Sequence, residues 1–256
     1  ALDLGVIDEF ADDFAVALKG ADLVLLAMPV GQPGRIMAQI SPHLEAATIV
    51  TDAGSTKQDV VAAARSFLAG QLKNFVPGHP IAGAELSGVD AANADLFRDK
   101  NVVLTPLDET SADAVQRVAA LWQGCGARVS QMRADQHDET LAAMSHLPHL
   151  LAFTLMSHVC ASAGTGTEDQ PDNLLPDDVL RFAGSSFRDF TRIAGSSPEM
   201  WRDICLANRE ALLRQLDAYQ NELTSLRELL ANGNGQALEK FFADAREARQ
   251  QWLNKP

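Results

Sequence analysis

The sequence predicts an α/β domain over residues 1–131 followed by an all-helical domain over residues 132–256. In the first part, short apolar runs alternate with amphipathic segments of about ten to fifteen residues, which is typical of βαβ units in an open sheet. In the second part, from Asp135 onward, strand-like runs stop and apolar residues recur at every third or fourth position. These two observations predict a sheet domain and a separate helical domain.

Composition limits the classes of partner. The chain has 256 residues, of which 46% are hydrophobic and 21% charged, and its formal net charge is -13. Nucleic acids and anionic membrane surfaces bind clustered Lys and Arg, so this charge argues against both as partners. The cysteines (Cys125, Cys160 and Cys205) are odd in number and far apart, which is typical of reduced thiols in a cytoplasmic protein. No apolar run approaches the roughly 20 residues that a membrane span requires.

The first part contains four apolar runs of strand length. Leu23 to Met28 is continuous and apolar, which suits a strand buried on both faces of a parallel sheet. The expected strands are 23–28, 48–52, 101–105 and 127–130, and the expected helices are 33–44, 55–68 and 111–124. The alternation predicts an open α/β sheet.

Two segments lie at the carboxyl ends of expected strands. Met28, Pro29 and Val30 end the first strand. Asp52 and Gly54 end the second. Ligands of open α/β sheets bind at these ends, so both segments are candidate nucleotide contacts.

One expected motif is absent from the sequence. A dinucleotide site opens with a strand and a G-x-G-x-x-G turn, followed by an acidic residue about twenty positions later. The sequence begins at Ala1 without this unit. We expect the first βαβ unit to lie upstream of Ala1.

His79 lies on a loop that its neighbours make stiff. Pro77 and Pro80 fix their own φ angles, while Gly78 and Gly83 permit tight turns. An imidazole whose position is set by the backbone suits a general acid or base. The alternative is a turn histidine that bonds to a backbone carbonyl.

Ser55 also has two interpretations. Ser55 and Gln58 have the S-x-x-Q spacing of a capping box, which predicts that Ser55 caps the helix expected over residues 55–68. The other interpretation is a catalytic hydroxyl. The two roles are compatible, because a helix N-terminus also favours a nearby anion.

A histidine pair lies early in the helical part. The apolar spacing from Leu141 to Val159 predicts one amphipathic helix that Pro148 kinks or locally unwinds. His146 and His149 lie one turn apart beside this proline. They are interpreted as core histidines, as a substrate contact or as a metal pair. The last is disfavoured because no carboxylate lies at ligand spacing in the same turn.

Arg192 belongs to a second polar cluster. Arg188 and Arg192 share a helical face, and Asp189 lies three residues before Arg192. An exposed salt bridge is one interpretation, and an arginine that binds a carboxylate in a pocket is the other. Residues 164–178, just upstream, are polar and rich in Gly, Asp and Pro, which predicts a loop.

A long helix is expected from Ser197 to Leu230. Ser197, Pro198 and Glu199 form a helix start, and an apolar stripe follows in which Asn208 is the polar exception. A helix apolar along one side must pack on an extensive surface, so we expect a homodimer built on it. A last helix is expected over residues 237–252.

Four motifs, read together, resemble the prephenate/arogenate (cyclohexadienyl) dehydrogenase family. They occur in the order of that family and cover most of the chain: Asp52-x-Gly54-Ser55-Thr56-Lys57, Gly78-His79-Pro80-Ile81-Ala82-Gly83, Ser145-His146-Leu147-Pro148-His149 and Phe187-Arg188-Asp189-x-Thr191-Arg192, followed by Trp201 and Asn208. The resemblance implies a Rossmann-type domain and an all-helical dimerisation domain with the active site between them. It also implies NAD(P)-dependent oxidative decarboxylation of prephenate or arogenate in tyrosine biosynthesis.

The resemblance also implies residue roles. His79 matches the family's catalytic histidine, and Ser55 matches the serine that hydrogen-bonds the same site. His146 and Arg192 match positions that hold the substrate carboxylates. The remaining matches on the substrate side are the acidic residues near the entrance, Glu85 and Asp189, together with Trp201. The histidine and arginine motifs would supply positive charge for a dianionic substrate.

Two rival interpretations remain at this level. A β-hydroxyacid-type dehydrogenase on a similar two-domain plan would use a lysine of the helical domain, yet the only lysines after residue 100 are Lys240 and Lys255, near the C-terminus. The second rival is a non-catalytic assembly protein. No residue here decides between prephenate and arogenate or between NAD and NADP, and none indicates tyrosine feedback.

Overall fold

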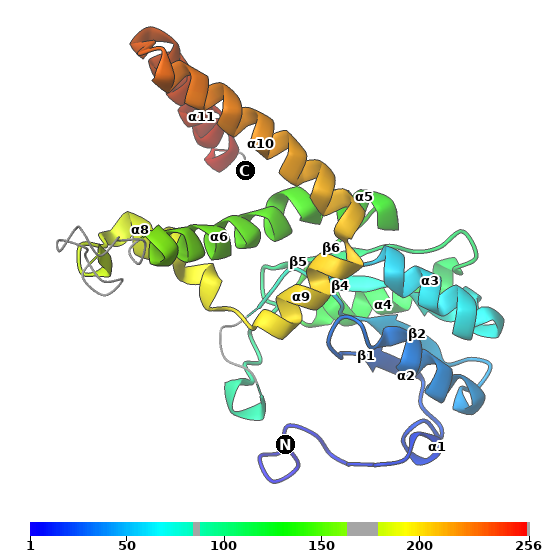
Figure 1. The fold of residues 1–256 in the computed structure, drawn as a ribbon. Coiled ribbons are helices and arrows are strands. Elements are labelled where there is room, and N and C mark those ends of the chain that lie inside the picture. The colour runs from blue at the N-terminus through cyan, green and yellow to red at the C-terminus, as the bar shows by residue number, and fades with distance from the viewer. Residues whose placement is uncertain (84–87, 163–178, 255–256) are drawn as a thin grey trace. The chain divides into compact units, whose positions relative to one another are not determined.

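The structure is a computed structural model that describes residues 1–83, 88–162 and 179–254 (Figure 1). The chain forms two compact units, Ala1–Leu212 and Leu213–Pro256. The domain boundary predicted after residue 131 falls inside the first unit and stays a prediction. The loop predicted over 164–178 lies outside the described residues.

The described strands of the first unit form two three-stranded sheets. They are β1 Leu23–Leu26, β2 Ile49–Asp52 and β3 Phe75–Val76 in the first sheet, and β4 Gly78–Pro80, β5 Asn101–Leu104 and β6 Arg128–Gln131 in the second. The first sheet is parallel, whereas β4 pairs antiparallel with β5, which pairs parallel with β6. Only Pro77 separates β3 from β4, and it has no N–H to donate, so the single open sheet expected from the sequence is divided here.

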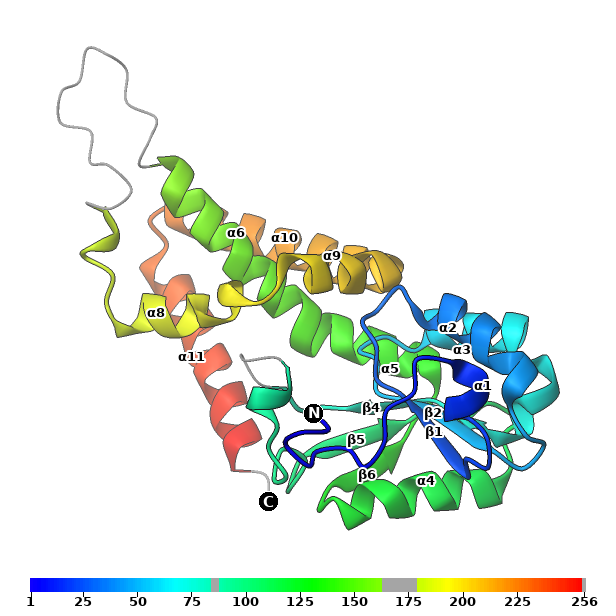
Figure 2. The ribbon, with the colours of Figure 1, turned by 90° about the horizontal axis from the view of Figure 1, so that it is seen from below.

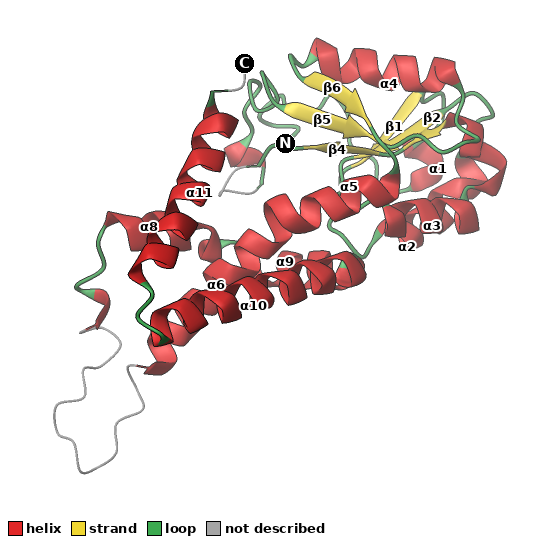
Figure 3. Ribbon diagram, turned by 90° about the horizontal axis from the view of Figure 1, so that it is seen from above, coloured by secondary structure: helices red, strands yellow, loops and turns green. Residues whose placement is uncertain are grey.

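Helices cover both faces of these sheets. The described helices of the first unit are α1 Phe14–Ala17, α2 Pro33–Ile40, α3 Gln58–Phe67, α4 Ala112–Gly124, α5 Ala134–Leu141, α6 Leu147–Ser162, α8 Ser185–Thr191 and α9 Pro198–Ala207. Short segments of 3-10 helix are η1 Ser41–His43, η2 Ala69–Asn74, η3 Val89–Ala91 and η5 Arg192–Gly195. Figure 3 shows α4 on one side of the strands and α2 and α3 on the other.

Alternating strand residues build a core on each face. Val50 and Phe75, both 0% exposed, pack with the buried residues of α2 and α3. Ile49 and Val76 point to the opposite face and pack with α4. β2 is therefore buried on both faces, as predicted. The same prediction is wrong for β1, where Leu25 is 42% exposed, because β1 pairs only with β2 in the described chain.

Two predicted helix limits need correction. The helix expected over 33–44 ends at Ile40 and continues as the 3-10 turn η1. The helix expected over 55–68 begins at Gln58, and the capping box of Ser55 and Gln58 is wrong. The carboxylate of Asp138 takes this role, since it accepts from the backbone N–H groups of Lys57 and Gln58 at 2.8 and 2.9 Å. A distant residue thus replaces the local cap.

The helical part departs from regular geometry at two points. A π-helical turn, Ala142–His146, joins α5 to α6 just before Pro148, which confirms the predicted local unwinding. The single long helix predicted from Ser197 is wrong, because it breaks at Asn208 between α9 and α10 Arg209–Ala231. Phe153 of α6 packs against the Trp201 cluster of α9, and the two helices run close together in Figures 1 and 2.

The second unit comprises most of α10 and the helix α11 Gly235–Leu253. Large apolar side chains on it are exposed, with Leu230 at 61%, Phe242 at 57% and Trp252 at 68%. None of the helices described is both long and apolar enough to cross a membrane.

Candidate active site

His79 lies on strand β4 and not on the predicted loop, and the side chains of Lys57 and Asp52 hold the backbone next to it. The buried Lys57 forms an ion pair with Asp52 and donates to the carbonyl of Gly78 at 2.7 Å. Asp52 Oδ1 in turn accepts from the N–H of Gly78 at 3.0 Å. A Cβ at position 78 would lie 3.0 Å from the carbonyl oxygen of Asp52, so this close approach requires glycine. The imidazole of His79 is therefore held on a fixed backbone, 9% exposed.

Asp52 holds two backbone segments together, and its predicted contact with a cofactor stays a prediction. It is 1% exposed, and its second carboxylate oxygen accepts from the N–H of Gly54 at 2.8 Å. Its side chain therefore holds the loop after β2 and strand β4 together. Of the other predicted cofactor residues, Val30 is buried against Trp201, which joins the β1 loop to α9.

Two residues that no sequence motif singled out, His137 and Asp138, lie next to His79 in a chain of hydrogen bonds. Nδ1 of His79 lies 2.8 Å from Nε2 of His137, and Nδ1 of His137 lies 2.8 Å from Oδ1 of Asp138. Both residues belong to α5 and are at most 1% exposed. The signal in the sequence is a neighbouring His-Asp pair on a predicted helix, which by itself does not differ from an ordinary polar surface.

His146 lies in the π-helical turn and is 1% exposed. Its Nδ1 lies 3.1 Å from Nδ2 of Asn208, and the same amide nitrogen donates to the carbonyl of Asp138 at 2.7 Å. An amide nitrogen only donates, so Nδ1 of His146 accepts and its proton lies on Nε2. The helix break at Asn208 places this amide between α5 and the π turn.

Trp201 lies between the two histidines of the predicted pair. Its ring stacks on His149 with 3.7 Å between centroids and meets His146 edge to face at 6.0 Å. His149 Nδ1 donates to the carbonyl of Ser145 at 2.8 Å. The charge of Arg192 contributes to lowering the pKa of His149, after burial, so Arg192 lies near this cluster. His146, His149, Trp201 and Arg192 are thus gathered in one region.

Burial makes these imidazoles neutral. It lowers the pKa of His146 to about 4. Burial, reinforced by the charges of His137, Lys57 and His146, also holds the pKa of His79 well below its ordinary value of about 6.5. For Asp138, burial opposes ionisation, but the hydrogen bonds from His137 and the N-terminus of α3 outweigh it and lower the pKa. The histidines therefore do not supply the positive charge expected from the sequence.

For three other residues predicted to belong to the site, the structure gives only their position in the chain or does not describe them. Ser55 is partly buried in the loop between β2 and α3. Asp189 is exposed on α8, one turn before Arg192. Glu85 lies outside the described residues. Their predicted roles stay predictions.

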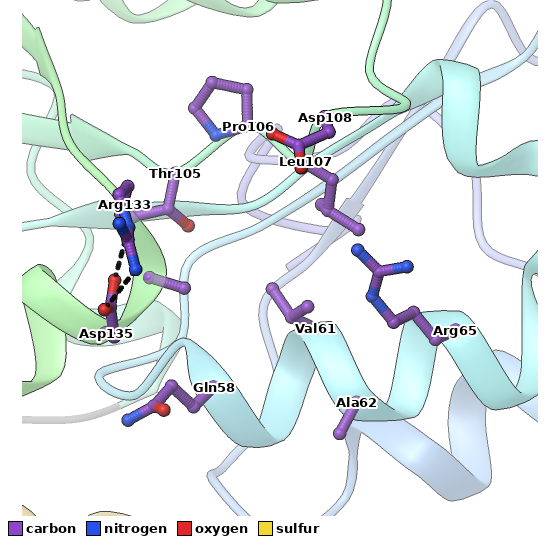
Figure 4. Close-up of a pocket in the computed structure, with 11 residues that line it drawn as sticks. Gln58, Val61, Ala62, Arg65, Thr105, Pro106, Leu107, Asp108, Arg133 and Asp135 are labelled. Carbon is purple, nitrogen blue, oxygen red and sulfur yellow. Dashed lines mark hydrogen bonds and ion pairs between the residues drawn. The ribbon is translucent and has the colours of Figure 1, made fainter.

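A separate pocket of about 360 Å³ lies beside α3 (Figure 4). Its arginines are engaged, because Arg133 pairs with Asp135 at 2.6 Å and Arg65 pairs with Glu109. The lining residues are Gln58, Val61, Ala62, Arg65, Thr105, Pro106, Leu107, Asp108, Arg133, Ala134 and Asp135. None of the residues predicted to bind or react is among them, so this pocket is not the candidate active site.

An α/β arrangement with helices on both faces binds ligands such as nucleotides at the carboxyl ends of its strands, and a buried neutral imidazole near those ends suits the general base of an enzyme. Comparison with known proteins specifies the family. The domain described as "Prephenate dehydrogenase, nucleotide-binding domain" matches residues 1–131, and "Prephenate dehydrogenase, dimerization domain" matches residues 133–244. The chain belongs to the prephenate dehydrogenase family.

Individual relatives agree with this assignment. Cyclohexadienyl dehydrogenase of Zymomonas mobilis is 39% identical over 97% of this chain and 80% of its own length. Prephenate dehydrogenase of Bacillus subtilis is 38% identical over 97% of this chain, which spans 64% of that protein. The crystal structure of prephenate dehydrogenase from A. aeolicus in complex with hydroxyphenyl propionate and NAD+ matches with a TM-score of 0.87 and 34% identity, over 98% of this chain and 84% of that one.

Proposed function

We propose that this protein carries out the NAD(P)-dependent oxidative decarboxylation of prephenate, of arogenate or of both, in tyrosine biosynthesis. The observation that carries the proposal is His79, a buried and neutral imidazole fixed on β4. A general base must be unprotonated at the working pH and held in place, and His79 satisfies both conditions. The names and the coverage of the relatives support the choice of substrate.

In this reaction His79 accepts the proton of the ring hydroxyl. Loss of the ring carboxylate as CO2 then restores aromaticity. A bound nicotinamide cofactor supplies the hydride acceptor for the carbon that bore the hydroxyl. Ser55, in the loop after β2, is proposed to hydrogen-bond the same hydroxyl.

The groups around Trp201 are proposed to hold the substrate. His146 offers an N–H at Nε2, because Asn208 occupies its Nδ1. Arg192 supplies the positive charge that the neutral histidines do not. A carboxylate that is bound by one neutral N–H and one arginine does not require two buried cations side by side. Asp189 and Glu85 are proposed to lie near the entrance.

The cofactor is proposed to bind at the carboxyl ends of β1 and β2. Met28, Pro29 and Gly54 lie in the loops at these ends. These residues fit one part of a dinucleotide site. They do not distinguish NAD from NADP.

We further propose that the protein is a cytoplasmic homodimer. The match to a dimerisation domain over 133–244 supports the association, as do the exposed apolar side chains of α10 and α11, such as Leu230 and Phe242. The free state of all three cysteines supports a reducing compartment.

The test is the cofactor reduction that the complete protein catalyses with each substrate. Prephenate and arogenate are supplied separately with NAD+ or NADP+, and reduced cofactor and CO2 are measured. The proposal expects equal amounts of both products with at least one combination. Failure of all four combinations, in a protein that is folded and binds NAD+ or NADP+, would refute it.

A further inference from the structure

A continuous chain of hydrogen bonds joins His79 to the N-terminus of α3. It passes from His79 Nδ1 to His137 Nε2, and from His137 Nδ1 to Asp138 Oδ1, with 2.8 Å at each step. Asp138 then accepts from the backbone N–H groups of Lys57 and Gln58. His137 and Asp138 are 0% and 1% exposed, so water does not compete for these bonds.

The chain of hydrogen bonds ends at Asp138, and this residue decides which atoms donate along it. Asp138 accepts two backbone N–H bonds, and its pKa lies below the ordinary value, so its carboxylate is ionised and only accepts. His137 must therefore donate from Nδ1. In the neutral ring, Nε2 of His137 then carries a lone pair and accepts, and His79 donates to it from Nδ1.

The ring of His137 is closed off from solvent. It is 0% exposed, so solvent supplies no other partner for its Nε2. Two N–H groups at the N-terminus of α3 already stabilise the Asp138 carboxylate, and the buried ammonium of Lys57 lies close enough for its charge to act on His79.

We propose that His137 and Asp138 are positioning residues that keep the proton of His79 on Nδ1 and leave Nε2 as the free base. In the described chain, Nε2 of His79 has no hydrogen-bond partner, so it is the nitrogen available to a substrate hydroxyl. An isolated neutral imidazole carries its proton mainly on Nε2, which would block that role. The inference rests on the proposed function only in naming Nε2 as the reacting atom; the tautomer itself does not depend on it.

The test compares two substitutions of His137 that have similar length. His137→Gln keeps an amide oxygen near the position of Nε2, so it still accepts from His79 Nδ1. His137→Met fills the same space without an acceptor. Asp138 is unsuitable for this comparison, because it also caps α3.

The direct readout is the 15N NMR spectrum of selectively labelled histidine at neutral pH. The chain has six histidines, and single His→Gln variants assign them. We expect His79 to be protonated on Nδ1 in the unsubstituted protein and in His137→Gln, and mainly on Nε2 in His137→Met. A proton on Nε2 in the unsubstituted protein, or an unchanged spectrum of His79 in His137→Met, would overturn the proposal.

Activity of the complete protein gives the second readout. We expect kcat to fall about 10- to 100-fold in His137→Met and only a few-fold in His137→Gln, with KM for the cofactor unchanged in both. Equal losses in the two variants would overturn the positioning role. If no substrate turns over while the NMR result holds, the proposed function fails and the tautomer assignment stands, so the two failures are distinguishable.

Discussion

His79 and His146 carry the same imidazole ring, but the hydrogen-bond partner of Nδ1 differs between them. Both imidazoles are buried and have lowered pKa values, so both are neutral. Nδ1 of His79 faces the ring nitrogen of His137, whereas Nδ1 of His146 faces the amide of Asn208. In the proposed tautomers the first partner accepts and the second donates, so Nε2 carries a lone pair in one ring and an N–H in the other. We infer that the hydrogen-bond partner of Nδ1 sets the proposed role of each ring.

Asp138 is the residue that links the two surroundings. Its carboxylate orients His137, and through it His79. Its carbonyl accepts from the amide of Asn208, which orients His146. One residue of α5 therefore fixes both imidazoles.

The largest effect is expected from removing the base. His79→Asn should lower kcat by about 10²-fold or more and leave KM for the substrate nearly unchanged, because the ring takes a proton and does not hold the carboxylates. Steady-state kinetics with prephenate measure both constants. Turnover close to that of the unsubstituted protein would show that His79 is not the base, and the contrast with His146 would then fail.

A smaller effect is expected at the partner of His146. Asn208→Leu removes the donor to His146 Nδ1 and one of the two hydrogen bonds that the carbonyl of Asp138 accepts, which should lower the free energy of unfolding by about 1–3 kcal/mol. His146 then loses its fixed tautomer, so KM for the substrate should rise more than kcat falls. Urea unfolding and kinetics measure these changes. The exposed neighbour Leu206, changed to Ala, is the control and should alter neither.

Acid should destabilise the fold through both imidazoles. A histidine with a lowered folded-state pKa contributes stability that is present above about pH 6.5 and is lost as the pH falls towards the folded-state value. For His146, whose pKa is about 4, the loss between these limits is on the order of 3 kcal/mol. His146→Gln should therefore show a shallower fall in the free energy of unfolding between pH 7 and 4.5. Parallel curves for the two proteins would show that His146 is not buried and neutral.

The smallest effect is expected at His149, which extends the comparison to a third imidazole. It is half-buried, stacks on Trp201 and donates to a backbone carbonyl. His149→Phe keeps the stacking and loses one hydrogen bond, so the free energy of unfolding should change by about 1 kcal/mol or less and kcat by only a few-fold. A loss as large as that of His79→Asn would show that His149, and not His146, is the donor of the site.

The sequence predicted the parts of this site that are built from local patterns. The prolines and glycines around His79 predicted a fixed backbone, although the segment is strand β4 and not a loop, and Pro148 marks the unwound turn that carries His146. The partners of both rings are distant in sequence. His137 is 58 residues from His79, and Asn208 is 62 residues from His146. No local pattern records such contacts.

The same distinction explains the errors in the predicted fold. Ser55 and Gln58 satisfy a local capping pattern, yet Asp138 caps α3 from a distance of 81 residues in the sequence. The apolar stripe continues through Asn208, so it predicted one helix where the structure has two. Asn208 was visible in the sequence as the polar residue of the stripe. The two groups that its amide bonds, the carbonyl of Asp138 and Nδ1 of His146, could not be read from the sequence.

The pH dependence of kcat/KM tests the central claim most directly, because its acid limb reports the pKa of the essential base in the free protein. With prephenate as substrate, we expect kcat/KM to stay constant well below pH 6.5, since burial lowers the pKa of His79. An acid limb at pH 6.5 or above would contradict the account, because it would identify the base as an imidazole in an ordinary, solvated environment.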